Sequence, residues 1–113
     1  MAFTGIGRTV LVANGVDTNI HTNSTTDAIS IIGSIIAYNT GGGASTLRLS
    51  LVRPDGTRII VTQAIGATTA VNYNRGGSNA LTPLTLLSGD SLVGQDTAAT
   101  VQVTISGLQI TVP

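Results

Sequence analysis

Apolar and polar residues alternate along most of this chain, and that period of two is the feature that most restricts its fold. Leu47, Leu49 and Leu51 alternate with polar residues, and residues 101–105 repeat the pattern with valine and isoleucine. Because successive side chains of a strand point to opposite faces, such a run places one face on a core and the other towards solvent or a partner. Thr, Val and Ile, which strands prefer, dominate these runs. The pattern predicts an all-β protein.

The predicted strands are short and follow one another closely. They are Arg8–Ala13, Asn19–Thr22, Ile29–Tyr38, Thr46–Arg53, Thr57–Ala64, Ala70–Asn74, Leu84–Leu87, Ser91–Val93 and Thr100–Val112. In residues 27–38 the apolar positions also fit helical spacing, so a helix is the alternative there. The several isoleucines and the central Gly33 favour a core strand bent at that glycine.

Turn-forming residues separate these segments. Arg53-Pro54-Asp55-Gly56 predicts a tight hairpin, because proline presets φ for a turn and glycine accepts a positive φ. About eight short strands with regular turns predict one antiparallel β-sandwich or jelly roll with no long helix. We expect residues 9–113 to form this domain. Residues 1–8 have no strand pattern and are expected to form a flexible N-terminal arm.

The last predicted strand changes the phase of its apolar pattern. Apolar residues fall on odd positions up to Ile105 and on even positions from Leu108. A bulge or bend at Ser106-Gly107 would produce this change, and glycine tolerates it. The strand would then serve one sheet first and afterwards cross to the other. Two short strands joined at Gly107 are the alternative.

Charge is scarce and balanced. Five arginines face five aspartates, lysine and glutamate are absent, and charged residues make up 9% of the chain, against about 25% in an average domain. Nucleic-acid binding and attachment to an anionic membrane both need a basic surplus, so neither is expected. A surface with so little charge is poorly protected against association. We therefore expect a homo-oligomer, with a trimer favoured.

No arrangement of residues indicates catalysis. His21 is the sole histidine, and no Gly-x-Ser-x-Gly motif accompanies it. Asp90 and Asp96 flank a short predicted strand and could share a calcium ion, but no Asp-x-Asp-x-Asp loop supports this. Cysteine is absent, so no thiolate can hold a metal or act as a nucleophile. We predict no catalytic, metal-binding or cofactor-binding residues.

Contact residues are expected where apolar, aromatic or basic side chains stand outside the predicted core. Tyr38 ends an apolar run and is expected inside the core, whereas Tyr73 lies beside a glycine-rich loop and is expected at the surface. Arg48 and Arg58 flank the hairpin turn, where pairing would place them on one region of a sheet. The candidate interface residues are Phe3, Ile6, Arg48, Arg58, Tyr73 and Arg75.

Several segments resemble a known class of proteins. They are residues 9–12, 47–52, the run Leu84-Thr85-Leu86-Leu87-Ser88-Gly89-Asp90-Ser91-Leu92, and residues 101–110. Together they make the chain similar to small all-β virion proteins of tailed bacteriophages. The most specific element is the Leu-x-x-Gly-Asp-Ser-Leu turn followed by a Val/Thr strand that ends in Ser-Gly.

The resemblance implies a non-enzymatic structural protein of a phage particle, assembled in the cytoplasm of the host bacterium. A cement or decoration protein that stabilises the capsid lattice is favoured, with the major capsid protein or other virion proteins as partners. A neck, tail or fibre-attachment protein is the alternative. A carbohydrate-binding module is a second alternative, although it would need more exposed aromatic residues than this chain supplies.

Overall fold

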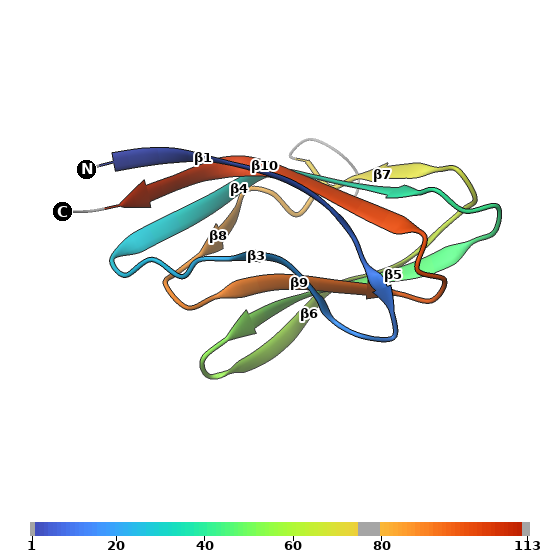
Figure 1. The fold of residues 1–113 in the computed structure, drawn as a ribbon, viewed down its shortest axis with the longest axis horizontal. Coiled ribbons are helices and arrows are strands. Elements are labelled where there is room, and N and C mark those ends of the chain that lie inside the picture. The colour runs from blue at the N-terminus through green and yellow to red at the C-terminus, as the bar shows by residue number, and fades with distance from the viewer. Residues whose placement is uncertain (1, 75–79, 112–113) are drawn as a thin grey trace.

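The computed structural model describes residues 2–74 and 80–111, and this part of the chain contains ten strands and no helix. In chain order they are β1 (Ala2–Leu11), β2 (Ala13–Asn14), β3 (Thr18–Thr22), β4 (Ala28–Asn39), β5 (Ser45–Arg53), β6 (Gly56–Ile65), β7 (Ala70–Asn72), β8 (Leu84–Leu86), β9 (Ser91–Asp96) and β10 (Val101–Thr111). They form two sheets packed face to face (Figure 1). The predicted all-β sandwich is confirmed, and the alternative of a helix in residues 27–38 is wrong.

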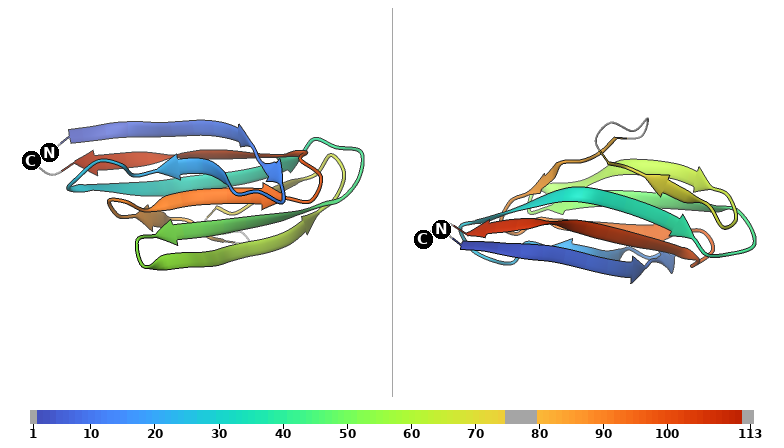
Figure 2. Two further views of the ribbon diagram at one scale, coloured as in Figure 1. Left: turned by 60° about the horizontal axis from the view of Figure 1, so that its bottom comes forward. Right: turned by 90° about the horizontal axis from the view of Figure 1, so that it is seen from above.

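Each of the two sheets contains five strands. Sheet A has the order β1-β10-β4-β7. β8 pairs with β4 on the same side as β7 does, nearer the beginning of β4. Sheet B has the order β2-β9-β5-β6, and β3 also pairs with β9. Every pairing is antiparallel except that of β2 with β9. The left panel of Figure 2 shows both layers, and the right panel looks on to sheet A.

The core lies between the inner faces of the sheets, where the alternating residues converge. Leu47 and Leu49 of β5 are fully buried, as are Val101 and Val103 of β10. Both strands were recognisable from their period of two, which therefore predicted these core positions correctly.

A buried asparagine fastens one end of the sandwich. Asn39, at the end of β4, donates from Nδ2 to the carbonyl oxygens of Gly43, Ile65 and Gly66 at 2.8, 3.0 and 3.2 Å. Its Oδ1 accepts from the Thr100 hydroxyl at 2.7 Å. Since Ile65 belongs to sheet B, this one side chain links the two sheets.

The structure corrects the expectation for the N-terminal residues. An arm without strand structure over residues 1–8 is wrong from Ala2 onward, because β1 pairs with β10 from Ala2 opposite Thr111 to Leu11 opposite Gln102. Ile6 is partly buried and packs against the core. The expected arm is therefore most of the edge strand of sheet A.

The predicted irregularity near Gly107 is confirmed, but its consequence differs from the expectation. The β10–β4 register shifts between Ser106 and Gly107, and the residue left without a partner is Gly33 of β4. β10 continues in sheet A to its end, between β1 and β4. The expectation that it crosses to the other sheet is therefore wrong.

Candidate interaction surface

Most of the exposed large apolar side chains lie on the outer face of sheet A. Nine large apolar residues are exposed in the described part of the chain. Six belong to this face: Phe3, Leu11, Ile29, Ile36, Tyr38 and Leu108. Soluble monomers rarely collect exposed apolar residues on one face, and such patches mark contact sites.

Strand register defines this face, because residues directly opposite one another in a sheet share a side. Val101, Val103 and Ile105 of β10 point inward and are buried, so the even-numbered residues of β10 point outward. We define the outer face of sheet A as Phe3, Gly5, Gly7, Thr9, Leu11, Gln102, Thr104, Ser106, Leu108, Ile110, Ile29, Ile31, Ser34, Ile36, Tyr38, Ala70, Asn72 and Thr85.

Large apolar side chains stand at both ends of the face, and the hydroxyl groups are concentrated in its middle rows. At the end near the chain termini, Phe3, Ile110 and Ile29 stand side by side across three strands. In the middle, the hydroxyl groups of Thr9 and Thr104 are hydrogen-bonded at 3.0 Å. Figure 2 (right) shows the strands that carry these rows lying beside one another.

No residue of the outer face of sheet A is charged. Arg8, the sole charged residue of β1, lies opposite Ile105 and therefore on the inner side. An uncharged face presents no repulsion to a second copy of itself and no steering field to a charged ligand. Contact through this face would depend on apolar burial and short-range hydrogen bonds.

The structure exchanges the roles expected for the two tyrosines. Tyr73 is 1% exposed and donates from its hydroxyl group to Gln63 Oε1 at 2.8 Å. Burial raises its pKa to about 12. Tyr38 is 40% exposed on the outer face of sheet A. The prediction that Tyr73 is a surface contact residue and Tyr38 a core residue is wrong.

Three predicted contact residues are arginines, and two of them, Arg48 and Arg58, lie within the described residues. Arg48 lies opposite Thr62 and Arg58 opposite Leu51, so the two point to opposite faces of the hairpin. The expectation that they share a region of one face is wrong, because Leu51, the partner of Arg58, is three residues from Arg48 along β5 and therefore points to the other face. Arg75 lies outside the described residues.

The arginines of the described residues differ in their partners. The Nε atom of Arg48 is buried without a hydrogen-bond partner. Arg53 Nε lies 3.4 Å from Asp90 Oδ2, an ion pair at the end of the β5–β6 hairpin. This pair, and not Arg48 with Arg58, is the charge interaction that the hairpin region makes.

Of the remaining predicted contacts, Phe3 and Ile6 point to opposite sides of β1. Phe3 is 62% exposed on the outer face of sheet A, in keeping with a contact role. Ile6 lies opposite Gly107 on the inner side and packs against the core. The sequence does contain a sign of the outer face of sheet A, because Leu108 and Ile110 are apolar at even positions. Our interpretation of this pattern as a bend of the strand concealed it.

The two aspartates considered for calcium have structural hydrogen bonds instead. They lie at opposite ends of the six-residue strand β9, and a strand of that length separates them by roughly 20 Å, too far to share one ion. Asp96 is 2% exposed and accepts from the backbone N–H groups of Ala99, Thr100 and Val101. Asp90 accepts from the Leu87 N–H at 2.9 Å.

His21 lies in β3, and its side chain reaches β4 of the other sheet. Its Nε2 is 3.2 Å from Ser30 Oγ of β4. Burial lowers the pKa of His21, and the positive charge of Arg8 lowers it further. Ser30 is fully buried, so its hydroxyl group is closed to a substrate, and the contact has the character of a structural link between β3 and β4.

Within residues 2–74 and 80–111, no helix is long and apolar enough to cross a membrane. The same residues contain no group of three or more His, Asp or Glu side chains placed to hold a metal ion. No known family model and no curated protein sequence matches this chain.

Proposed function

We propose that this chain is a non-enzymatic structural protein that assembles with copies of itself through the outer face of sheet A. The observation that carries the proposal is the collection of six exposed large apolar side chains on a face without charge. Burial of each such side chain favours association, and no buried charge opposes it.

The dimensions of the face suit a second copy. β1 has ten residues, and a strand rises about 3.3 Å per residue while neighbouring strands lie about 4.8 Å apart. Four strands therefore present about 600 Å², and two such faces would bury about 1,200 Å² in total, above the roughly 1,000 Å² that a specific interface needs. The hydroxyl groups of the middle rows can hydrogen-bond across the contact.

We further propose that the assembly belongs to a tailed-phage particle, as a cement or decoration protein of the head. The support is the resemblance of the strand and turn segments to small all-β virion proteins, together with a low charge suited to repeated protein contacts. In the trimer that the resemblance favours, three copies would turn this face towards a threefold axis, and each would divide the face between its two neighbours.

Self-association is tested with a charge placed on the face. We expect the wild-type protein to sediment as an oligomer at micromolar concentration, and Leu108→Asp to raise its dissociation constant more than tenfold. Val16→Asp is the matched control, because Val16 is 64% exposed and lies outside this face. A monomeric wild type, or equal effects of the two substitutions, would contradict the proposal.

The location in the particle is tested by immunogold electron microscopy of the phage that encodes this chain. We expect label over the head surface. Label confined to the neck, tail or fibres would favour the alternative position, and particles without label would refute a virion role.

A further inference from the structure

The second long edge of the sandwich is β6, which has a partner among the described strands on one side only. β6 pairs with β5 from Gly56 to Ile65, and no other described strand pairs with it. Alternate residues of an edge strand direct their N–H and C=O groups away from the sheet, where another extended chain can bond to them.

This edge has few of the features that usually prevent strand addition. The segment from Ile59 to Ile65 contains no charged residue and no proline, and Ile59 is 55% exposed. Natural edges are commonly protected by lysine, proline or inward-pointing charges. The β6 edge carries only Arg58, near its beginning, and the bulge at Ile60.

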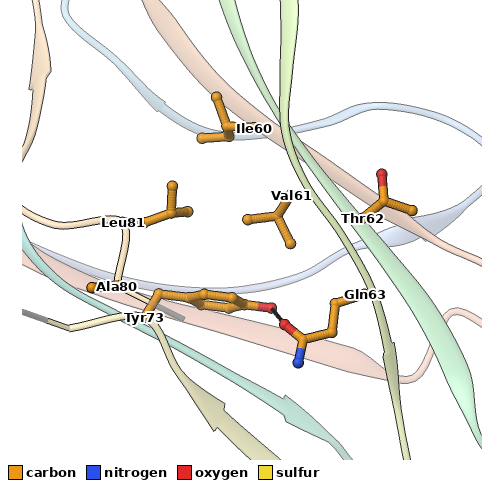
Figure 3. A pocket seen from close by; sticks show the side chains of 7 residues that line it. All are labelled: Ile60, Val61, Thr62, Gln63, Tyr73, Ala80 and Leu81. Carbon is orange, nitrogen blue, oxygen red and sulfur yellow. Dashed lines mark hydrogen bonds between the residues drawn. The ribbon is translucent and has the colours of Figure 1, made fainter. Parts of the chain in front are cut away.

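A pocket of about 330 Å³ opens beside this edge. β6 contributes Ile60 and Val61 to its wall, and Leu81 lies across from them (Figure 3). In a regular strand, consecutive side chains point to opposite faces, whereas those of Ile60 and Val61 lie on the same side of β6 (Figure 3). The bulge at Ile60 allows it, because bulges redirect side chains.

The base of the pocket is held in place. Tyr73 lies there with its hydroxyl group bonded to Gln63 of β6, as Figure 3 shows. The Tyr73 carbonyl oxygen accepts from the Leu81 N–H at 2.8 Å, and the Tyr73 N–H donates to the Ile35 carbonyl at 2.9 Å. These bonds connect the pocket to both sheets, so it is formed before any ligand arrives.

We propose that the β6 edge binds an extended, uncharged segment of a different protein as an added strand. One aliphatic side chain of that segment enters the pocket between Val61 and Leu81. The backbone groups of β6 select an extended chain, and Ile60, Val61 and Leu81 offer apolar contacts to the side chain that enters. Strand addition with a pocket for one side chain is a recurring mode of peptide recognition.

A separate partner fits this edge better than a second copy does. The outer face of sheet A and β6 belong to different sheets, so an oligomer formed through that face leaves β6 open. In the proposed assembly, β6 would then connect each copy to another component. The choice of a separate partner therefore rests on the proposed oligomer, whereas the edge and the pocket are present in a single chain.

The experiment selects ligands from a displayed library of random decapeptides and measures synthetic versions of the selected sequences by titration. We expect uncharged sequences rich in Thr and Val with one required Val, Ile or Leu, whose replacement by Gly weakens binding about tenfold or more. Backbone amides of β6 should become protected from hydrogen exchange when the peptide binds.

Ala80→Trp supplies the test of the site, because Ala80 is exposed and lines the pocket (Figure 3), so the new ring would occupy it. We expect this variant to bind the peptides at least about tenfold more weakly, whereas Ala98→Trp, at an exposed residue outside the pocket, should change binding less than twofold. A library that yields no peptide, or peptides that bind both variants equally, would overturn the proposal.

The oligomer mass is measured on the same samples, which keeps the two proposals distinguishable. We expect Ala80→Trp to leave the mass unchanged. If Ala80→Trp dissociates the oligomer instead, a second copy occupies β6, and the proposal of a separate partner is wrong.

Discussion

Substitution of Gly107 by Ala tests whether the close contact of β10 with β4 is essential. Gly107 lies opposite Ile32, where the β10–β4 register shifts. A Cβ atom at this position would overlap the carbonyl oxygen of Ile31 and lie 3.0 Å from the Ile32 Cα atom. Both obstacles are backbone atoms in a paired strand, so relief requires the two central strands of sheet A to move apart.

The expected loss of stability follows from that movement. Forcing an extra carbon into a packed site costs about 1–3 kcal/mol, and each weakened interstrand hydrogen bond adds roughly 1 kcal/mol. We expect Gly107→Ala to lower the free energy of unfolding by about 2–4 kcal/mol. For a domain of about this size, the melting temperature should fall by roughly 10–25 °C.

Gly5→Ala is the matched control in the neighbouring strand. Gly5 lies opposite Leu108, and a Cβ atom there would meet nothing within 4 Å. Alanine loses less backbone entropy on folding than glycine, so Gly5→Ala should stabilise by up to about 1 kcal/mol. Urea unfolding of both variants measures the difference. If Gly107→Ala unfolds within about 1 kcal/mol of Gly5→Ala, the close approach is not what stabilises these strands.

Two further predictions concern buried polar groups. Asp96→Ala should lower the free energy of unfolding in urea by about 3–5 kcal/mol, because several buried donors lose their acceptor. The control Asp17→Ala loses one exposed hydrogen bond from Gln95 and should cost under about 1 kcal/mol. Equal losses would contradict the structural role of Asp96. The pKa of His21 is lowered in the folded state, so the unfolded chain binds the proton more readily and stability should fall as the pH drops below about 6.5. His21→Gln should remove this dependence below about pH 6.5, and an unchanged pH profile would refute it.

The alternating pattern predicted the core well, because it depends only on side-chain direction in a strand. The hairpin turn at Pro54 also followed from local backbone preferences. The N-terminal strand could not be recognised in the same way. Residues 2–7 include two glycines and form an edge strand that is largely exposed, so pairing with β10 and not burial determines its structure.

The candidate surface was hidden by an assumption about apolar residues. Leu108 and Ile110 follow Ile105 out of phase, and we interpreted the change as a strand that leaves its sheet. The strand in fact continues in sheet A, and these residues face outward. Sequence alone cannot separate a bent strand from an outward apolar patch, because both give the same break in the pattern.

The register of the β5–β6 hairpin could not be predicted from the sequence either. Arg58 pairs with Leu51, which is three residues from Arg48 along β5, so the two arginines point to opposite faces. Their nearly equal distances from the turn in the sequence do not reveal this pairing. Tyr73 could be buried only if its hydroxyl group had a hydrogen-bond partner inside the protein. Gln63 supplies it from the other sheet, a contact that becomes visible only in three dimensions.

The central claim, that the outer face of sheet A is buried between copies, can be tested directly because the chain contains no cysteine. Thr104→Cys places a single thiol at the middle of this face, and Thr62→Cys places one on the outer side of sheet B. The reaction rate of each thiol with a maleimide is measured across a dilution series. We expect the thiol at position 104 to be protected at high concentration and to become reactive on dilution, while the thiol at position 62 reacts equally at all concentrations. Equal reactivity of both thiols at every concentration would contradict the claim.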